Sequence, residues 1–385
     1  MRNYLRGTKL ALLALPLFAV SASAQIAVSA NDNKQTINNG VVGIPANPAP
    51  DTVAIIDLGV SPPKVIAELN APNSVQGPPQ NVAVAPDESF ALVASAMKHD
   101  PADLKKLVPD DKVSVTDLKA SPPAVIATVQ SGLGAAGVSI NRAGNLALVA
   151  NRAEGTVSVF TIANKALTGV GKIQLGDAKS GPSHVAFLPD GKSALVTRDG
   201  DHRISVLSVD GNKVEDTKKY MVAGFRPYAM AISSRSTVAV LVNQGGGQGD
   251  TDMITVIDLK QDPPRIVDTI SVEQIPEGAA MSPDGNHVAV TMQNGSNKPP
   301  SHPNYNKGSI LSVFRIEGTK LTLVAKSEFG PWAQGVVWSK DGKTLLAQSM
   351  ADKAIDVLSF DGQALKKTGS IKVGGGAAGI RTALD

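Results

Sequence analysis

The chain has 385 residues, with 37 Lys and Arg against 34 Asp and Glu, and it contains no cysteine. The absence of cysteine excludes disulfides, thiolate metal sites and a cysteine nucleophile. Three of the basic residues, Arg2, Arg6 and Lys9, lie in the first 24 positions, so the rest of the chain is near neutral instead of +3. A near-neutral chain has no basic footprint for nucleic acid, and we predict no nucleic-acid partner.

The first 24 residues have the pattern of a secretory signal peptide. The basic positions precede an apolar run from Leu10 to Val20, and Ala22-Ser23-Ala24 matches a cleavage site before Gln25. The run is too short for a transmembrane span, and no later stretch is long and apolar enough to be one. We therefore predict cleavage after Ala24, a periplasmic or secreted location, no transmembrane anchor, and one domain over residues 25–385.

A short strand pattern, Val-x-Val-x-Asp-Leu in its clearest form, recurs through this domain. Its seven copies are Val53 to Leu58, Val113 to Leu118, Val157 to Ile162, Ile204 to Val209, Ile254 to Leu259, Leu311 to Ile316 and Ile355 to Phe360. Alternating apolar residues indicate half-buried strands. Self-similarity at a period of about 40–50 residues is typical of a propeller or a solenoid. Only Ala102 to Leu107 is compatible with a helical turn.

Turns of the Pro-Asp-Gly type precede these strands, most clearly at 189–191, 283–285 and 340–342, where the last has Lys in place of Pro. Six such turns accompany seven copies of the strand. The missing turn is explained if the two chain ends share one unit, with Val373 to Leu384 as its first strand and Ile26 to Asn31 as its second. We therefore predict an all-β, seven-bladed β-propeller of four-stranded blades, closed by pairing of the N- and C-terminal segments, which removes exposed sheet edges.

Within this pattern, Leu148-Val149-Ala150-Asn151 followed by Gly155-Thr156-Val157-Ser158-Val159 resembles the Tyr-Val-Thr-Asn (YVTN) repeat. Gly181-Pro182-Ser183-His184 through Gly191 resembles the opening strand and turn of that repeat, although the signature Tyr is replaced by Leu or Val in every copy. The resemblance covers essentially the whole mature chain. It implies a YVTN-type propeller of the lactonase-like superfamily, which includes lactonases, electron-transfer subunits and binding proteins.

Aligning the repeats predicts two rings of residues at the mouth of the central channel. The ring at the start of the first strands is Gln80, Ala136, Ser183, Tyr228, Glu277, Gln334 and Ala378, with Asn81 and His184 one residue later. The ring at the end of the second strands is Ser95, Asn151, Arg198, Asn243, Met292, Ser349 and Asn31. Polar residues at these positions are normal in a wet channel, where they satisfy backbone groups and water.

The ring members with acid–base or anion-binding chemistry are the candidates for function. His184 and Glu277 have the chemistry of a general acid and base, and Arg198 that of an anion-binding group, so these three are the predicted catalytic residues. The predicted ligand-binding residues are Gln80, Asn81, Asn151, Tyr228, Asn243, Trp332, Gln334 and His302.

Four insertions, over residues 31–51, 97–111, 244–252 and 293–308, are predicted to crowd the same face. Asp250 and Asp252 have a spacing seen in calcium loops but lack the remaining ligands, so we predict no metal and no cofactor. The favoured hypothesis is a monomeric binding scaffold that takes a small molecule or a protein at its loop-rich face, without catalysis. The alternatives are a lactonase-like hydrolase acting on a small sugar lactone or related ester and, less favoured, a partner subunit in periplasmic redox chemistry.

Overall fold

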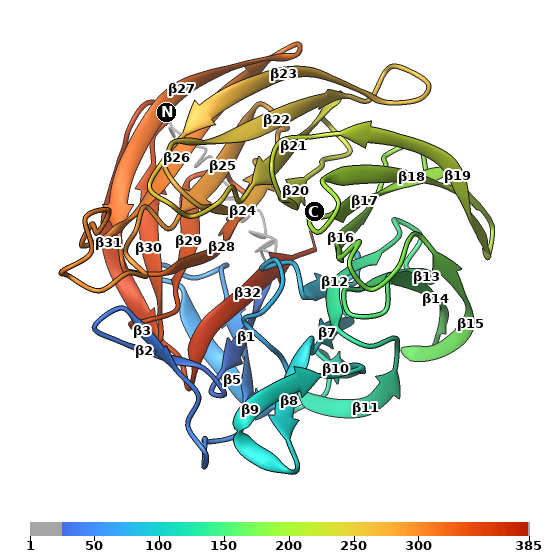
Figure 1. The fold of residues 1–385 in the computed structure, drawn as a ribbon, viewed down its shortest axis with the longest axis horizontal. Coiled ribbons are helices and arrows are strands. Elements are labelled where there is room, and N and C mark those ends of the chain that lie inside the picture. The colour runs from blue at the N-terminus through green and yellow to red at the C-terminus, as the bar shows by residue number, and fades with distance from the viewer. Residues whose placement is uncertain (1–24, 384–385) are drawn as a thin grey trace, which may run out of the picture.

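The computed structural model describes residues 25–383, and the predicted signal peptide lies outside them. Seven four-stranded antiparallel sheets are arranged around a central axis, and no helix occurs in the described part (Figure 1). The prediction of a seven-bladed propeller is therefore confirmed. Between residues 25 and 383 the structure offers no helix of the length and apolarity that crossing a membrane requires.

One blade joins the two ends of the chain, as the sequence predicts. Its strands, from the axis outward, are β32 (Gly376–Thr382), β1 (Ile26–Asp32), β4 (Thr52–Asp57) and β5 (Lys64–Asn70). Strand β32 pairs antiparallel with β1, with Ile380 opposite Ser29 and Thr382 opposite Ala27. The ring is closed by these main-chain hydrogen bonds, which leave β1 paired on both sides, with β32 and with β4, and make β32 the innermost strand of the blade.

The other six blades follow one another in chain order, each running from the axis to the rim. The first three are β6 (Val82–Val84), β7 (Phe90–Ala94), β10 (Lys112–Asp117) and β11 (Ala124–Gln130); β12 (Ala135–Ile140), β13 (Leu146–Asn151), β14 (Thr156–Ala163) and β15 (Ala166–Gln174); and β16 (Pro182–Phe187), β17 (Ser193–Arg198), β18 (Arg203–Asp210) and β19 (Lys213–Val222). The last three are β20 (Pro227–Ala231), β21 (Val238–Asn243), β22 (Asp252–Asp258) and β23 (Arg265–Val272); β24 (Pro276–Met281), β25 (His287–Met292), β26 (Ser309–Glu317) and β27 (Lys320–Phe329); and β28 (Ala333–Trp338), β29 (Thr344–Ser349), β30 (Ala354–Phe360) and β31 (Leu365–Lys372).

Two small hairpins stand outside the blades. They are β2 (Thr36–Asn38) with β3 (Val41–Gly43), and β8 (Met97–Asp100) with β9 (Asp103–Pro109). The second hairpin corrects the expectation of a helical turn at Ala102 to Leu107. Leu107 pairs with His99 across the hairpin, so the main-chain groups of this segment are satisfied by a ladder.

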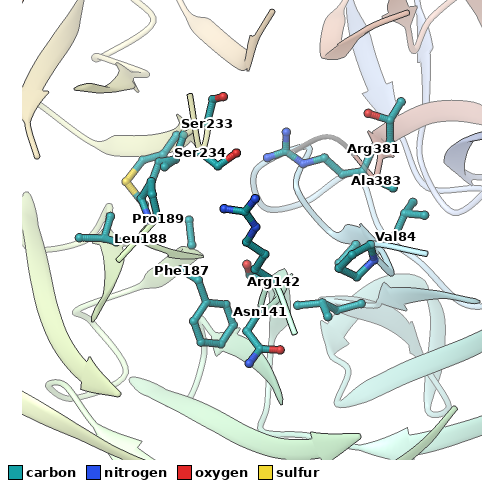
Figure 2. A pocket seen from close by; sticks show the side chains of 18 of the residues that line it. Val84, Asn141, Arg142, Phe187, Leu188, Pro189, Ser233, Ser234, Arg381 and Ala383 are labelled. Carbon is teal, nitrogen blue, oxygen red and sulfur yellow. The ribbon is translucent and has the colours of Figure 1, made fainter. Parts of the chain in front are cut away.

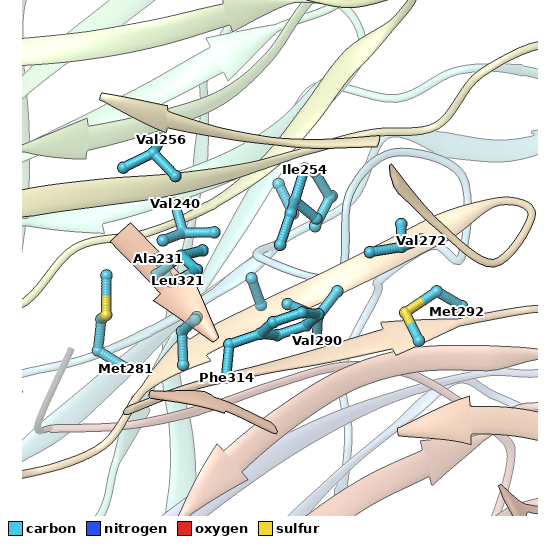
Figure 3. Close-up of a cluster of buried hydrophobic side chains, with 14 of the residues drawn as sticks. Ala231, Val240, Ile254, Val256, Val272, Met281, Val290, Met292, Phe314 and Leu321 are labelled. Atoms are coloured by element: carbon cyan, nitrogen blue, oxygen red, sulfur yellow. The ribbon is translucent and has the colours of Figure 1, made fainter. Parts of the chain in front are cut away.

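The core consists of apolar layers between neighbouring blades. Each of the seven blade–blade interfaces has its own cluster of buried apolar side chains. In Figure 3, Val240 and Ile254 of one blade face Val290 and Phe314 of the next. Middle strands such as β13 are covered on both faces, which explains their continuous apolar sequence, whereas the outermost β5 alternates between exposed and half-buried positions.

The tight turns between first and second strands lie at the opposite end of the blades from the insertions. Gly191, Gly285 and Gly342 close three of them with φ of 66°, 74° and 69°, a region that favours glycine. Each innermost strand therefore runs from a loop-rich face to a face made of these turns. The channel has two ends with different surroundings, and each end holds a cavity.

Candidate functional site

The cavity at the loop-rich face is built on the starts of three innermost strands. Tyr228, Glu277 and Gln334 are each the second residue of their strand, β20, β24 and β28, so equivalent positions bring them to the same level. The cavity measures about 270 Å³, and we call it the loop-face cavity. Its wall is formed by Gln35, Val42, Val75, Gln76, Gly77, Arg152, Arg226, Tyr228, Gln244, Glu277, Gln293, Trp332 and Gln334.

Glu277 is the acidic side chain of this wall, and it is only 2% exposed. The side-chain amides of Gln244 and Gln293 donate to its Oε2 at 2.8 and 2.9 Å. Burial raises the pKa of Glu277 to about 7, against the opposing effect of these two hydrogen bonds. No residue of the described range donates to Oε1. A carboxyl with this pKa can exchange a proton near neutral pH.

Two guanidinium groups lie in the same wall, on the side of Asp199. Arg152 forms an ion pair with Asp199 and donates through Nε to Ser183 Oγ at 3.1 Å, and Ser183 Oγ itself donates to Asp199 Oδ1 at 2.8 Å. Arg226 is 3.8 Å from the same carboxylate. The Asp199 side chain is 5% exposed and that of Arg152 is 27% exposed, so this pairing anchors a partly exposed guanidinium to a buried carboxylate.

Tyr228 contributes a phenol to this group. The Arg152 guanidinium lies 6.0 Å from the centre of the Tyr228 ring. Burial raises the pKa of Tyr228 far above its usual value, and the nearby Glu277 carboxyl raises it further. The phenol therefore stays protonated at physiological pH, and its hydroxyl has a proton to donate.

Three of the insertions meet above the cavity. Lys298 Nζ donates to the Gly247 carbonyl at 2.5 Å, which connects the insertions 293–308 and 244–252. The turn of the β2–β3 hairpin is packed tightly against Lys298, because a Cβ at Gly40 would lie 2.0 Å from the Lys298 carbonyl carbon. Gln35 and Val42 come from this third insertion and line the cavity. The convergence predicted from the sequence is present for these three segments.

The predicted catalytic residues lie in three different surroundings. Glu277 lines the loop-face cavity, whereas His184 lines a second cavity at the other end of the channel. Arg198 lines neither, because it pairs with Asp201 of its own β17–β18 connection and donates to Ser205 Oγ at 3.2 Å. The structure therefore does not bring the three side chains into one cavity.

The predicted ligand-binding residues divide in a similar way. Tyr228, Trp332 and Gln334 line the loop-face cavity. The residues that lie outside its wall are Gln80, Asn81, Asn151, Asn243 and His302. Asn151 and Asn243 donate to the third strand of their own blade, to Thr156 Oγ1 and Thr255 Oγ1 respectively, each at 2.9 Å. That bonding gives both asparagines a structural role within the blade.

Four residues in or beside the loop-face cavity that the sequence analysis did not name as candidates lie one position further along the chain than ring members. Arg152, Gln244 and Gln293 directly follow the ring members Asn151, Asn243 and Met292, and Asp199 follows Arg198. Each of the four residues lies just past the end of a second strand, β13, β17, β21 or β25, where the chain turns at the loop-rich face. In the sequence, these residues could have been recognised as charged or amide side chains that immediately follow the second strands.

The metal prediction concerns the Asp250 and Asp252 pair. Within residues 25–383, no three His, Asp or Glu side chains form a group that could hold a metal ion. Asp252 instead accepts a hydrogen bond from the main-chain N–H of Ile275 at 2.6 Å, which connects its loop to the start of β24.

The fold is that of a seven-bladed β-propeller, and solved structures share it over almost the whole chain. The chain shares its fold with a provisionally assigned 6-phosphogluconolactonase from Bacteroides fragilis, at 16% identity and a TM-score of 0.72 over 94% of this chain and 99% of the other. The periplasmic gluconolactonase of Pseudomonas aeruginosa is similar at 15% identity and a TM-score of 0.68, over 94% and 99% of the two chains. Hydrazine synthase of Kuenenia stuttgartiensis is similar over 76% of this chain and 79% of its own, at 20% identity and a TM-score of 0.57. No family model and no curated protein sequence matches the chain.

Proposed function

We propose that this protein is a lactonase-like hydrolase that opens a small, polyhydroxylated lactone in the loop-face cavity. The observation that carries the proposal is the buried Glu277 carboxyl, whose pKa of about 7 suits proton transfer at neutral pH. It shares the cavity wall with Arg152, Arg226 and the protonated Tyr228. The proposal thus selects the hydrolase alternative over the binding scaffold favoured by the sequence.

The proposed reaction uses these groups in two steps. Ionised Glu277 takes a proton from water through Oε1, while the water oxygen forms a bond to the lactone carbonyl carbon. Arg152 and the Tyr228 hydroxyl donate to the oxyanion that develops on the carbonyl oxygen. The bond from the former carbonyl carbon to the ring oxygen then breaks, and Glu277 returns its proton to that oxygen. The product is a hydroxy acid whose new carboxyl group releases its proton to solvent, and the resulting carboxylate lies beside the two guanidinium groups.

The hydroxyl-rich character of the ligand is supported by unpaired acceptors in the wall. The side-chain oxygens of Gln244, Gln293 and Gln334 are buried and have no hydrogen-bond partner among the described residues. A buried acceptor without a donor costs about 1–3 kcal/mol, so hydroxyl groups of a ligand fit these positions. One solved structure with this fold is named as a gluconolactonase and another as a provisionally assigned 6-phosphogluconolactonase, which favours sugar lactones as the class to test.

The proposal is tested by measuring acid release from glucono-1,5-lactone and 6-phosphogluconolactone, with spontaneous hydrolysis subtracted. We expect saturable turnover, with kcat/KM rising about tenfold per pH unit below pH 7 and levelling above it, because only ionised Glu277 accepts the proton. The absence of turnover, together with calorimetric binding of gluconate, would instead establish the binding scaffold.

A second expected result concerns the anchor of Arg152. Asp199→Asn removes the charge that fixes Arg152 and Arg226, so we expect gluconate to bind about 10- to 100-fold more weakly, the loss typical of a charge-assisted hydrogen bond. The matched control is Asp201→Asn, which removes the partner of Arg198 outside the cavity and should leave gluconate affinity unchanged. Equal affinities in the two variants would show that Asp199 does not position the anion-binding groups.

Two further parts of the sequence analysis remain proposals. Export through the signal peptide agrees with the periplasmic location stated in the name of the Pseudomonas aeruginosa structure. The role as a partner subunit in redox chemistry is supported by no more than the fold shared with hydrazine synthase.

A further inference from the structure

A second and larger cavity opens at the opposite end of the channel, on the face made by the tight turns. It measures about 820 Å³, and we call it the turn-face cavity. The far ends of the innermost strands and the turns that follow them, including residues 140–143, 186–191 and 232–235, form its wall. Its size lies within the range of about 300–1,000 Å³ that is usual for small-molecule sites. The proposed hydrolysis makes no use of it.

The wall of this cavity is strongly basic. Arg142, Arg235, Lys340 and Arg381 line it, and Asp190 is the one lining carboxylate among the described residues. The Asp190 carboxylate is already engaged by its own turn, where it accepts from the main-chain N–H groups of Lys192 and Ser193 and from the Ser193 hydroxyl. Figure 2 shows the guanidinium groups of Arg142 and Arg381 projecting into the open space of the cavity.

Neutral His184 adds a hydrogen-bonding group to the wall. Its Nδ1 accepts from the main-chain N–H of Met230 at 3.1 Å, which places the ring proton on Nε2. Burial lowers the pKa of His184 well below its usual value, and the positive charge of Arg381 lowers it further. His184 therefore stays neutral and keeps one ring N–H, and the charged lining residues between 25 and 383 are Arg142, Arg235, Lys340 and Arg381 against Asp190.

Apolar side chains make up another part of the same wall. Phe187, Leu188, Met230 and Ile232 lie on the side of β16 and β20, and Val84 and Ile140 end the neighbouring strands β6 and β12. Burying apolar ligand surface against such a wall is favourable by roughly 25 cal/mol per Å². The cavity thus offers both cationic donors and an apolar surface to one ligand.

The two cavities are formed by different residues. The linings of the turn-face cavity and of the loop-face cavity have no residue in common. Between them the innermost strands of neighbouring blades pack closely, since a Cβ at Gly278 would lie 2.7 Å from the Gln334 carbonyl oxygen. Glu277 lines the loop-face cavity and not the turn-face cavity.

We propose that the turn-face cavity is a separate binding site for a small organic anion with an apolar body, such as a carboxylate or sulfonate on a hydrocarbon or aromatic frame. The cationic rim binds the anionic group, His184 donates to it, and the apolar wall takes the body of the ligand. The site is independent of the proposed hydrolase function and holds if that function is wrong.

The proposal is tested with 8-anilinonaphthalene-1-sulfonate, decanoate, decanol and inorganic phosphate as probes of the full-length mature protein. We expect one saturable sulfonate site whose fluorescence is displaced by decanoate. Decanol, which lacks the charge, and phosphate, which lacks the apolar body, should each compete at least tenfold less well than decanoate. Competition by decanol or phosphate as strong as that of decanoate would overturn the proposal, as would the absence of a saturable site.

Variants locate the site on the turn face. Arg142→Glu reverses an exposed charge in the cavity wall, and we expect it to weaken decanoate binding at least tenfold. The matched control is Lys366→Glu, an exposed position on the outermost strand β31, which should leave binding unchanged. Glu277→Gln should also leave it unchanged, since that residue lines the other cavity. Equal weakening by Arg142→Glu and Lys366→Glu would show non-specific charge attraction and would contradict the assignment.

Discussion

Replacing Glu277 by Gln is expected to lower kcat for lactone hydrolysis by about 10²- to 10⁴-fold, the usual contribution of a positioned general base. The substitution keeps the size of the side chain and a carbonyl oxygen that accepts from Gln244 or Gln293, so the cavity wall retains its shape. Because the substituted side chain has no carboxylate to receive the proton of the attacking water, KM should change much less than kcat. Initial rates with glucono-1,5-lactone measure both constants.

The same substitution is expected to make the protein more stable than the wild type above neutral pH. Burial raises the pKa of Glu277 from its ordinary 4.5 to about 7, so the folded state holds this proton more tightly than the unfolded state. The resulting stabilisation is complete below about pH 4.5 and is lost as the pH rises through 7. The shift corresponds to roughly 3 kcal/mol. The wild type should therefore lose about that much free energy of unfolding relative to Glu277→Gln between pH 4.5 and pH 8.

The control for both measurements is Glu273→Gln. Glu273 lies just before β24 and forms an ion pair with Lys326 at the surface, outside the loop-face cavity. Removing the Glu273 charge should change both kcat and the pH dependence of the free energy of unfolding by no more than a small amount. If Glu277→Gln retained wild-type kcat, the carboxyl would not be the base, and the hydrolase proposal would fail at its central residue.

Replacing Ile380 by Ala is expected to destabilise the protein by about 2–5 kcal/mol, the range measured for large-to-small changes in cores. Ile380 is 1% exposed and lies on β32, where it packs in the cluster between the closing blade and the blade of β28–β31. Strand β32 also forms the main-chain ladder to β1 that closes the ring. Thermal and urea unfolding of the two proteins measures the difference in free energy.

The matched control for the closing strand is Ile126→Ala. Ile126 lies on the outermost strand β11 and is 49% exposed, so its truncation leaves no buried cavity and should cost well below 1 kcal/mol. A similar loss in both variants would argue that the closing blade contributes no more to stability than the rim of the ring. A loss confined to Ile380→Ala is the result that the closed topology requires.

The fold was accessible from the sequence because each blade repeats the same local information. Apolar strands such as Leu146–Asn151 and turns such as Pro189-Asp190-Gly191 specify strands and their connections through short-range rules. The count of turns against strands was enough to predict that β32 and β1 share one blade. The β8–β9 hairpin was not predicted, because this short polar segment shows neither the two-residue apolar period of a strand nor the 3.6-residue period of a helix.

The site was accessible only in part. The first-strand ring correctly placed Tyr228 and Gln334 beside Glu277 at the channel mouth, because equivalent positions of a repeat lie at the same level. It also grouped His184 and Arg198 with Glu277, although their side chains lie elsewhere. His184 follows the ring position by one residue and therefore faces the other cavity.

By itself the sequence determined the number of blades, their closure and the end of the channel at which the insertions gather. All three follow from a repeated period, which is a property of the chain. Only the tertiary structure decided which side chain of each strand end faces the channel. Irregular pairing near the start of β16, β20 and β24 shifts the register there, and a shift of one residue turns a side chain from the blade to the cavity. It therefore took the folded ring to bring Arg152, Asp199 and Arg226 together beside Glu277, and to gather a second set of basic residues at the opposite end of the channel.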